Sequence, residues 1–359
     1  MTETPAQPKI PVPVIIASDP LPSLWPLSTR ERPFVFRPDQ SGVSPARRLL
    51  LALARRPEFP APILFAPDTA ADTVMEQLSG ILPQARIVFV PAIDNPGCIA
   101  VLAAMMNDVS AHSRQLALLP ANFHSPSFGA VLDSVCAMAE RSAELQMPVA
   151  FVRPVRARGE CAHGDIALEI SGREDRSRLP VGRVMTAEKL ASDCEALIEM
   201  SAIVRSMGIY IGNGDAILRR AAAAHPTAYE SCRLALTFAD QDGSRLRSRL
   251  KFLSLARGIM IDDLIGAASL DLILHQVADT AILVRTLADI APGQTERGSH
   301  SARVMVEGYE DSRTFVSDDG VLVIRRGFEH LARVHFDSGR TQSEERAGQA
   351  FALPARLTA

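Results

Sequence analysis

Short runs of apolar residues alternate with amphipathic stretches along the chain as far as residue 152. The runs are continuously apolar, which is typical of strands buried on both faces of a parallel sheet. The stretches between them space their apolar residues as helices do, and they predict helices that cover the sheet. The predicted strands are 12–17, 63–66, 87–90, 116–119 and 149–152, and the predicted helices are 46–54, 69–78, 97–106 and 128–143.

This order of elements predicts an α/β fold with a Rossmann-like, mostly parallel sheet. Right-handed crossovers bring the carboxyl ends of parallel strands to one edge, where ligands bind. Residues 155–183 are polar and predict a loop or a small antiparallel insert. Further helices are expected at 186–201 and 214–224, and helical segments within 246–255 and 261–275.

The pattern of apolar and polar residues changes after about residue 292, where short apolar runs are separated by Gly and Asp turns. These runs, at 303–307, 313–317, 321–325 and 332–336, predict a short β-helix-like unit at the C-terminal end. The pattern divides the chain into a polar, Pro-rich tail over 1–11, a main domain over 12–292, a small β unit over 293–340 and a loose tail over 341–359.

The charge and the cysteines narrow the classes of partner. A net charge of -3 argues against nucleic acid or an anionic membrane as the main partner.

The five cysteines are odd in number and form no C-x-x-C pair, so neither a disulfide framework nor a zinc site is expected. A cytoplasmic location fits this cysteine usage best. Positive charge comes almost wholly from arginine, because the chain has only three lysines.

One segment carries a specific resemblance. The first predicted strand is followed by a six-residue loop and then by Leu24-Trp25-Pro26-Leu27-Ser28. This arrangement resembles the start of bacterial mannose-1-phosphate guanylyltransferases, in which a strand, the loop G-G-x-G-T-R and L-W-P-L-S follow one another. Trp25 is the only tryptophan of the chain, and it suits a core anchor as well as a contact to a base.

Weaker matches follow in the same order as in that family. Pro91 with Asn95 resembles its R-N segment, Leu119-Pro120-Ala121 its L-P-A-D-H, and residues 206–210 its N-S-G-M-F. Residues 225–232, 259–262 and 314–331 resemble later segments. The resemblance covers about residues 12 to 335, and it implies the nucleotidyltransferase fold. It also implies the conversion of GTP and mannose 1-phosphate to GDP-mannose and diphosphate, for polysaccharide synthesis.

The family's chemistry requires groups that this chain lacks. Transfer at the α-phosphate depends on positioning and charge neutralisation by a glycine-rich loop, an Arg, a Lys and Mg²⁺ held by Asp. Here the loop has no glycine, and its prolines remove backbone donors. Ser23 stands in place of the motif Arg, Phe34 in place of the Lys, and Asn122 in place of a metal-binding Asp.

The resemblance assigns degenerate positions of the site. The nucleotide-binding positions are Ser18, Asp19, Ser23, Trp25 and Asn95. Asp19 also suits a turn. The metal-binding positions are Asn122 and Asp289. Arg153, Arg156 and Gly208 are candidates for contact with the sugar or phosphate, and Lys189 and Asp289 are the candidates for catalysis. The family's E-K-P lysine has two registers here, one at 181–183 and one at Glu188-Lys189, which the sequence leaves open.

Two functions follow. The first is a catalytically weak or inactive paralogue that binds a sugar nucleotide or sugar phosphate, or that regulates a partner such as a second copy or an active paralogue. The alternative is an active sugar-phosphate nucleotidyltransferase with an altered substrate and rebuilt catalytic residues, which would use Mg²⁺.

Overall fold

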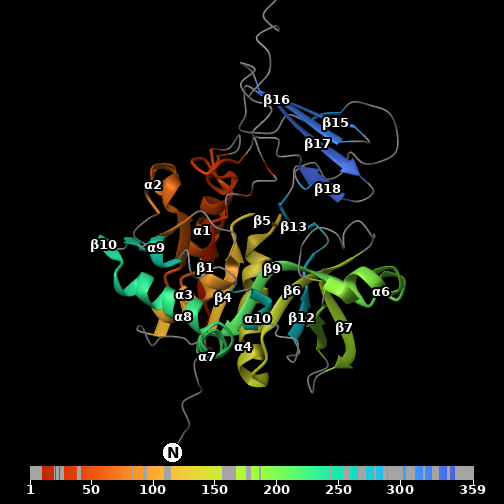
Figure 1. Ribbon diagram of the computed structural model, residues 1–359, viewed down its shortest axis with the longest axis horizontal. Coiled ribbons are helices and arrows are strands. Elements are labelled where there is room, and N and C mark those ends of the chain that lie inside the picture. The colour runs from red at the N-terminus through yellow and green to blue at the C-terminus, as the bar shows by residue number, and fades with distance from the viewer. Residues whose placement is uncertain are drawn as a thin grey trace, which may run out of the picture.

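The computed structural model describes residues 10–19, 21, 24, 28–38, 42–81, 85–91, 95–108, 115–155, 167–174, 179–185, 187–242, 245–248, 250–253, 259, 261–265, 272–278, 280–285 and 289. Beyond residue 300 it describes the backbone of five strands, and a few residues within the ranges above are likewise described by backbone alone. Within these residues the chain forms a large mixed sheet covered by helices on both faces (Figure 1).

The centre of the large sheet is parallel, as the apolar runs predict. Strand β1 (Val12–Ile16) pairs in parallel with both β2 (Ile63–Pro67) and β4 (Gln115–Pro120), and β2 pairs in parallel with β3 (Arg86–Val90). The spatial order is β3-β2-β1-β4, so the carboxyl ends of these strands lie together at one edge.

Antiparallel strands extend the sheet beyond β4. The long strand β9 (Ile203–Asn213) runs antiparallel between β4 and β6 (Val149–Pro154). The polar region after β6 contains β7 (Ala167–Glu174) and β8 (Pro180–Val184), which pair with each other antiparallel. They confirm the antiparallel insert as one of the two forms expected there.

The two faces of the sheet bury separate clusters of apolar side chains. Val14 and Phe65 belong to one cluster and Ile15 and Leu64 to the other, as the two-residue repeat of a strand requires. Among the described helices, the Ile15 face is covered by α1 (Pro45–Ala54), α2 (Ala71–Leu78) and α4 (Phe128–Leu145). The Val14 face is covered by α3 (Pro96–Asp108), α7 (Gly214–Ala224), α8 (Pro226–Thr237), α9 (Leu250–Leu253) and α10 (Ile261–Ile265).

Helices α9 and α10 confirm helical segments within 246–255 and 261–275, and strands that were not predicted lie beside them. β11 (Arg245–Arg247) pairs with β3 and with β10 (Asp240–Asp242), and β12 (Leu272–Gln276) lies between β6 and β8. A short apolar run such as Leu-Ile-Leu in β12 suits a buried strand as well as a helix, and periodicity alone cannot separate them. Helix α6 (Ala187–Glu199) confirms the helix expected there.

The C-terminal strands form a sheet of their own. β14 (Ala302–Val304), β15 (Ser312–Ser317), β16 (Gly320–Arg325), β17 (Leu331–Asp337) and β18 (Arg340–Ser343) pair antiparallel, each with the next. This meander corrects the expected β-helix-like unit, whose successive coils would pair in parallel. The short connections after β15, β16 and β17 favour antiparallel neighbours in this way.

Two further observations concern predictions about the whole chain. In the portion that the structure describes, no helix is both long and apolar enough to cross a bilayer. Cys98, Cys136 and Cys232 are free thiols, whereas Cys194 on α6 is disulfide-bonded. The cysteine spacing offered no sign of this bond, because the residues of a disulfide can be far apart in sequence.

Candidate functional site

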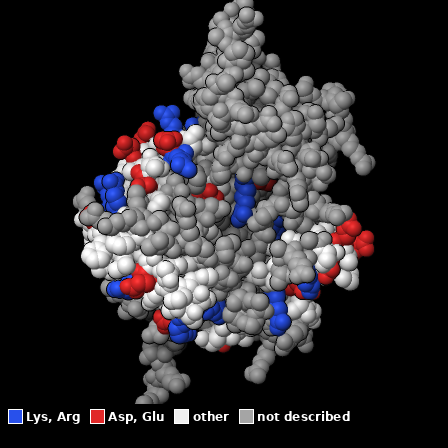
Figure 2. Space-filling view, in the orientation of Figure 1, with Lys and Arg blue, Asp and Glu red and all other residues white. Residues whose placement is uncertain are grey.

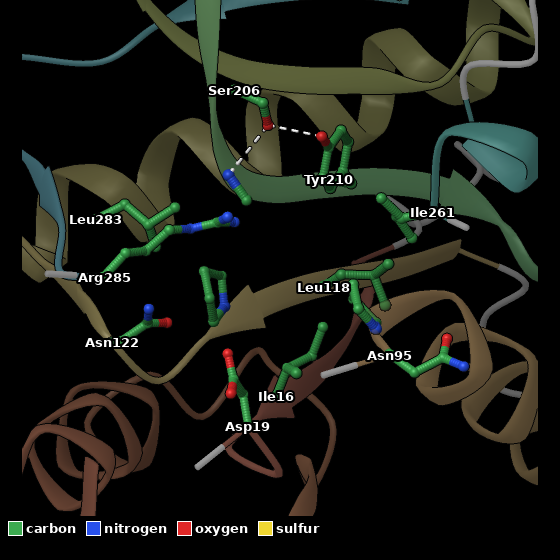
Figure 3. A pocket seen from close by; sticks show the side chains of 13 residues that line it. Ile16, Asp19, Asn95, Leu118, Asn122, Ser206, Tyr210, Ile261, Leu283 and Arg285 are labelled. Atoms are coloured by element: carbon green, nitrogen blue, oxygen red, sulfur yellow. Dashed lines mark hydrogen bonds between the residues drawn. The ribbon is translucent and has the colours of Figure 1, made fainter. Parts of the chain in front are cut away.

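A pocket lies where β1 and β4 end, at the carboxyl edge of the parallel strands (Figure 3). It encloses about 80 Å³ and is small beside the roughly 300–1,000 Å³ of sites for drug-sized ligands. Its lining combines apolar side chains with a few polar and charged ones. The lining residues are Ile16, Asp19, Asn95, Pro96, Leu118, Pro120, Asn122, Ser206, Gly208, Tyr210, Ile261, Leu283 and Arg285.

Four of the residues that the resemblance assigned meet in this pocket. They are Asp19, Asn95, Asn122 and Gly208. The first three follow or flank the carboxyl ends of β1, β3 and β4, and Gly208 lies in β9 beside β4. The topology of the sheet therefore gathers residues that are up to 189 positions apart in the sequence.

Asp19 serves the loop after β1. Its Oδ1 accepts a hydrogen bond of 2.8 Å from the N–H of Leu21, which has a left-handed φ of 48°. An Asx turn of this kind satisfies a donor locally and fixes the direction of the chain. Ser18, which precedes it, is only 1% exposed. Ser18 is thus buried and does not line the pocket, whereas Asp19 has the turn role that its residue type suggests.

Asn95 begins the helix beside the pocket. Its Oδ1 accepts a hydrogen bond of 2.8 Å from the N–H of Cys98, in the first turn of α3. This is the bond of an N-cap, and it satisfies a backbone donor that the helix itself leaves open. Asn95 therefore both lines the pocket and fixes the start of α3.

Asn122 joins two segments that are far apart in sequence. Strands β5 (Phe123–His124) and β13 (Ile282–Leu283) pair antiparallel next to the pocket. Beside this pairing, Nδ2 of Asn122 donates a hydrogen bond of 2.7 Å to the carbonyl of Val284. The Val284 N–H in turn donates to the carbonyl of Asn122 over 3.0 Å. The residue at a metal-binding position of the family thus holds the segment that follows β13.

Asp289 holds the same segment from its other end. Its Oδ2 accepts a hydrogen bond of 2.9 Å from the backbone N–H of Arg285. Asp289 is not among the residues that line the pocket, although Arg285 is. Both metal-binding positions assigned by the resemblance therefore contact the backbone of Val284 and Arg285.

Gly208 lies in an irregular part of β9. Its φ is +71°, and an added Cβ would lie 3.1 Å from Cγ of Pro120. The Ser206 hydroxyl donates to the Tyr210 hydroxyl over 2.7 Å and accepts from the Gly208 N–H over 3.1 Å (Figure 3). The pairing of β9 with β6 shifts register over this stretch. Glycine is required here because the left-handed backbone brings β9 close to the end of β4.

The remaining candidates lie elsewhere. Lys189 on α6 forms an ion pair with Glu169 on β7, and it is not among the residues that line the pocket. Arg153 lies on β6, where it faces Arg205 of β9 in the register, and it does not line the pocket either. Ser23, Trp25 and Arg156 lie outside the described residues. Of the positively charged candidates, the two that the structure describes, Arg153 and Lys189, therefore do not line the pocket.

Arg285 is the positive residue that the sequence analysis missed. Its side chain extends into the pocket beside Leu283 (Figure 3). Arg285 belongs to no recognisable motif. Two features of the sequence could have indicated it: it follows a short apolar run, Ala281 to Leu283, and it precedes Asp289 by four residues. Ser206 and Tyr210 were also missed as site residues, although both belong to the segment that resembles N-S-G-M-F.

A histidine adjoins the site without lining the pocket. His124 on β5 follows Asn122 by two residues. Desolvation lowers its pKa, and the positive charge of Arg48 lowers the pKa further. The imidazole of His124 is therefore neutral at pH 7.

The residues at the two metal-binding positions do not fit a Mg²⁺ site. Magnesium in proteins is held by one or two carboxylates together with substrate phosphates and water. Asn122 is a neutral amide whose nitrogen is committed to Val284, and Asp289 is committed to the backbone of Arg285. Among the described side chains, no group of three His, Cys, Asp or Glu residues is arranged to hold a metal ion.

Comparison with known proteins defines the fold. The chain matches no protein-family model and no curated protein sequence. Its three-dimensional fold is nevertheless shared with solved structures of enzymes that are named for mannose phosphates. The mixed α/β architecture, with its parallel centre, is thus a known fold at very low sequence identity.

Two of these structures match over most of their length. The crystal structure of mannose-1-phosphate geranyltransferase from Thermus thermophilus aligns with a TM-score of 0.62 at 17% identity, over 88% of this chain and 95% of that chain. The structure of mannose-6-phosphate isomerase from Helicobacter pylori aligns with a TM-score of 0.57 at 13% identity, over 76% of this chain and 99% of that chain.

Proposed function

We propose that this chain is a diverged protein of the sugar-phosphate nucleotidyltransferase type that binds a sugar phosphate or sugar nucleotide and transfers nucleotides weakly or not at all. Three lines support the proposal. The fold is shared with enzymes named for mannose phosphates. The pocket lies at the ligand-binding edge of the sheet. The L-W-P-L-S segment and the motifs after it resemble mannose-1-phosphate guanylyltransferases.

The observation that carries the loss of catalysis is the role of Asn122 and Asp289. Both side chains hold the backbone at Val284 and Arg285, and they do not form a set of metal ligands. Nucleotidyl transfer depends on charge neutralisation in the transition state, and the loss of one oriented group typically costs about 10²–10³ in rate. Several such groups differ here, because Ser23 and Phe34 stand in place of the motif Arg and Lys.

An assay of diphosphate release tests the catalytic part. Purified protein is incubated with GTP, mannose 1-phosphate and Mg²⁺, and with the other nucleoside triphosphates and sugar 1-phosphates as a panel. We expect no release above the rate without enzyme. Turnover in the ordinary enzyme range, about 1 s⁻¹ or faster, with any pair of the panel would contradict the proposal and establish the active transferase instead.

The binding part has its own measurement. Thermal unfolding is followed with mannose 1-phosphate, GDP-mannose and GTP, each with and without Mg²⁺. A ligand that binds the native state raises the melting temperature as its concentration exceeds its Kd. We expect the sugar phosphate or the sugar nucleotide to raise the melting temperature without Mg²⁺. Addition of Mg²⁺ to GTP should give no further rise.

We also propose a protein partner and a cellular location. The proposed partner is a second copy of the chain or an active paralogue, and light scattering of the purified protein tests whether the chain associates with itself. We propose a cytoplasmic location from the odd and widely spaced cysteines. The disulfide at Cys194 speaks for an oxidising compartment, so a thiol count on protein isolated from its cells decides between the two.

A further inference from the structure

We propose that Arg285 binds the phosphate of a sugar phosphate in this pocket, and that it does so without a metal ion. The inference rests on the proposed function and names the ligand class and the residue that recognises it. It starts from the segment that follows β13. This segment carries an arginine into the pocket, whereas the positive residues expected from the sequence lie elsewhere or outside the described residues.

The backbone that carries Arg285 is held at three points. Leu283 pairs with Phe123 in the register of β13 and β5. Val284 exchanges two hydrogen bonds with Asn122, and the Arg285 N–H donates to Asp289. A binding group is most effective when its position is fixed before the ligand arrives. These contacts therefore position Arg285, and they give Asn122 and Asp289 a role in binding that requires no metal.

The chemistry of the side chain selects the ligand. A guanidinium offers a planar fork of N–H donors, which matches two oxygens of a phosphate and stays charged at any physiological pH. Polar groups of Ser206, Tyr210 and Asn122 line the same pocket. A phosphate beside Arg285 is neutralised by the arginine itself, so the pocket has no need of Mg²⁺.

Asp19 sets the orientation of the ligand. Its carboxylate lines the pocket on the side of β1, across from the guanidinium of Arg285 (Figure 3). A carboxylate repels a phosphate but accepts hydrogen bonds from hydroxyl groups. We therefore orient the phosphate toward Arg285 and the sugar hydroxyls toward Asp19 and Asn95. The Asp19 carboxylate disfavours a triphosphate, because the longer chain of phosphates would bring negative charge close to it.

The size of the pocket agrees with a small ligand. About 80 Å³ is enclosed by the lining residues, well below the range of pockets that take drug-sized molecules. A phosphate with part of one sugar ring matches such a space better than a nucleoside triphosphate does. The inferred ligand class is thus a monosaccharide monophosphate.

Calorimetric titration of the full chain tests this assignment. Mannose 1-phosphate, mannose and inorganic phosphate are titrated in EDTA into the unmodified protein, Arg285→Gln, Arg285→Lys and the control Arg141→Gln. Arg141 lies on the exposed side of α4, where it pairs with Glu144. Figure 2 shows that side chains of both charges are interspersed over the described surface. We expect Arg285→Gln to raise the Kd for mannose 1-phosphate at least tenfold and Arg285→Lys to raise it severalfold, because an ammonium lacks the planar fork. Arg141→Gln should leave the Kd unchanged.

The outcomes separate this inference from the proposed function. If the unmodified protein binds mannose 1-phosphate but Arg285→Gln binds it equally well, Arg285 is not the phosphate-binding residue and the proposed function stands. A requirement for Mg²⁺ would overturn the metal-free mode in the same way. If the unmodified protein binds no sugar phosphate and no sugar nucleotide, the proposed function itself fails. Thermal unfolding of each variant is measured beside the titration, and Arg285→Lys keeps the test decisive if Arg285→Gln does not fold.

Discussion

Asn122 and Val284, 162 positions apart in the sequence, bind each other through two hydrogen bonds. The Asn122 amide nitrogen donates to the Val284 carbonyl over 2.7 Å, and the Val284 N–H donates to the Asn122 carbonyl over 3.0 Å. In the family that the sequence resembles, the position of Asn122 is that of a metal-binding Asp. An amide can donate where a carboxylate cannot, so this exchange turns a ligand position into a structural contact.

The first prediction concerns the reversal of that exchange. Asn122→Asp removes the donor to the Val284 carbonyl and places a carboxylate beside it. We expect a loss of about 1–3 kcal/mol in the free energy of unfolding, because a buried acceptor is left unsatisfied. Urea denaturation measures it. Asn213→Asp is the matched control, since Oδ1 of Asn213 only accepts, from the N–H of Ala216, and Asp caps helices equally well. The two variants should differ clearly, and equal stability would contradict this role of Asn122.

The second prediction concerns Gly208. Gly208→Ala forces an L-residue into a φ of +71° and brings its Cβ to 3.1 Å from Pro120. We expect a loss of about 1–2 kcal/mol in stability together with weaker ligand binding, because the wall of the pocket must move. Gly129→Ala in α4 is the control, since nothing lies within 4 Å of its added Cβ. That variant should be neutral or slightly more stable, and a neutral Gly208→Ala would show that β9 relaxes without cost.

The third prediction concerns pH. Desolvation lowers the pKa of His275, whose ring lies 4.8 Å from the ring of Phe151. The unfolded chain therefore binds this proton more readily than the folded one. The stability that the neutral imidazole contributes is present above its ordinary pKa of about 6.5 and is lost as the pH falls through the lowered value.

Urea denaturation between pH 8 and pH 5 checks this dependence. His275→Gln should flatten the loss of stability on the acid side relative to the unmodified protein. Addition of His124→Gln to that variant should flatten the loss further, because desolvation and the charge of Arg48 also lower the pKa of His124. If the double variant loses stability with falling pH as steeply as the unmodified protein, these two histidines do not cause the pH dependence.

The fourth prediction concerns thiol reactivity. Cys98 on α3 and Cys232 on α8 are fully buried, with their sulfur atoms 3.6 Å apart. The contact with Cys232 raises the pKa of the Cys98 thiol, and burial raises it too. Because the thiolate is the reactive form, the raised pKa slows the reaction of Cys98, and because both thiols are buried, both should resist a disulfide reagent until the chain unfolds. Cys136, which is half-buried, should react first, and Cys136→Ser should remove that phase. Rapid modification of Cys98 in the native protein, detected by peptide mass, would contradict the packing of α3 against α8.

The regular part of the fold is predictable from local sequence. Residues 214–224 form a helix with the predicted limits, because Asn213 caps its first turn and Pro226 follows its end. The continuous apolar runs mark β1 to β4 in the same way. β12 was missed because its five residues carry no periodicity that separates a buried strand from a helix, and its place between β6 and β8 is a property of the tertiary structure.

The candidate site is predictable in part for the same reason. Asp19, Asn95 and Asn122 were identified through the family resemblance, and they meet in one pocket because each follows a parallel strand whose end lies at the same edge of the sheet. Arg285 was not, because its position depends on the pairing of β13 with β5, which lie far apart in the sequence. The role of Asp289 was open for a similar reason, since only the structure shows that its carboxylate accepts from the Arg285 backbone.

β9 is hydrogen-bonded to β6 along one edge, and along the other edge to β7 near its start and to β4 near its end. Insertion of a single residue between Met207 and Ile211 would turn one of the two away from the apolar cluster that both belong to. The regularly paired part of β9 therefore tolerates a change of side chain more readily than a change of length, which the irregular stretch around Gly208 accommodates. Insertions and deletions are tolerated best in the connections between strands, because there they leave the register of the paired strands unchanged.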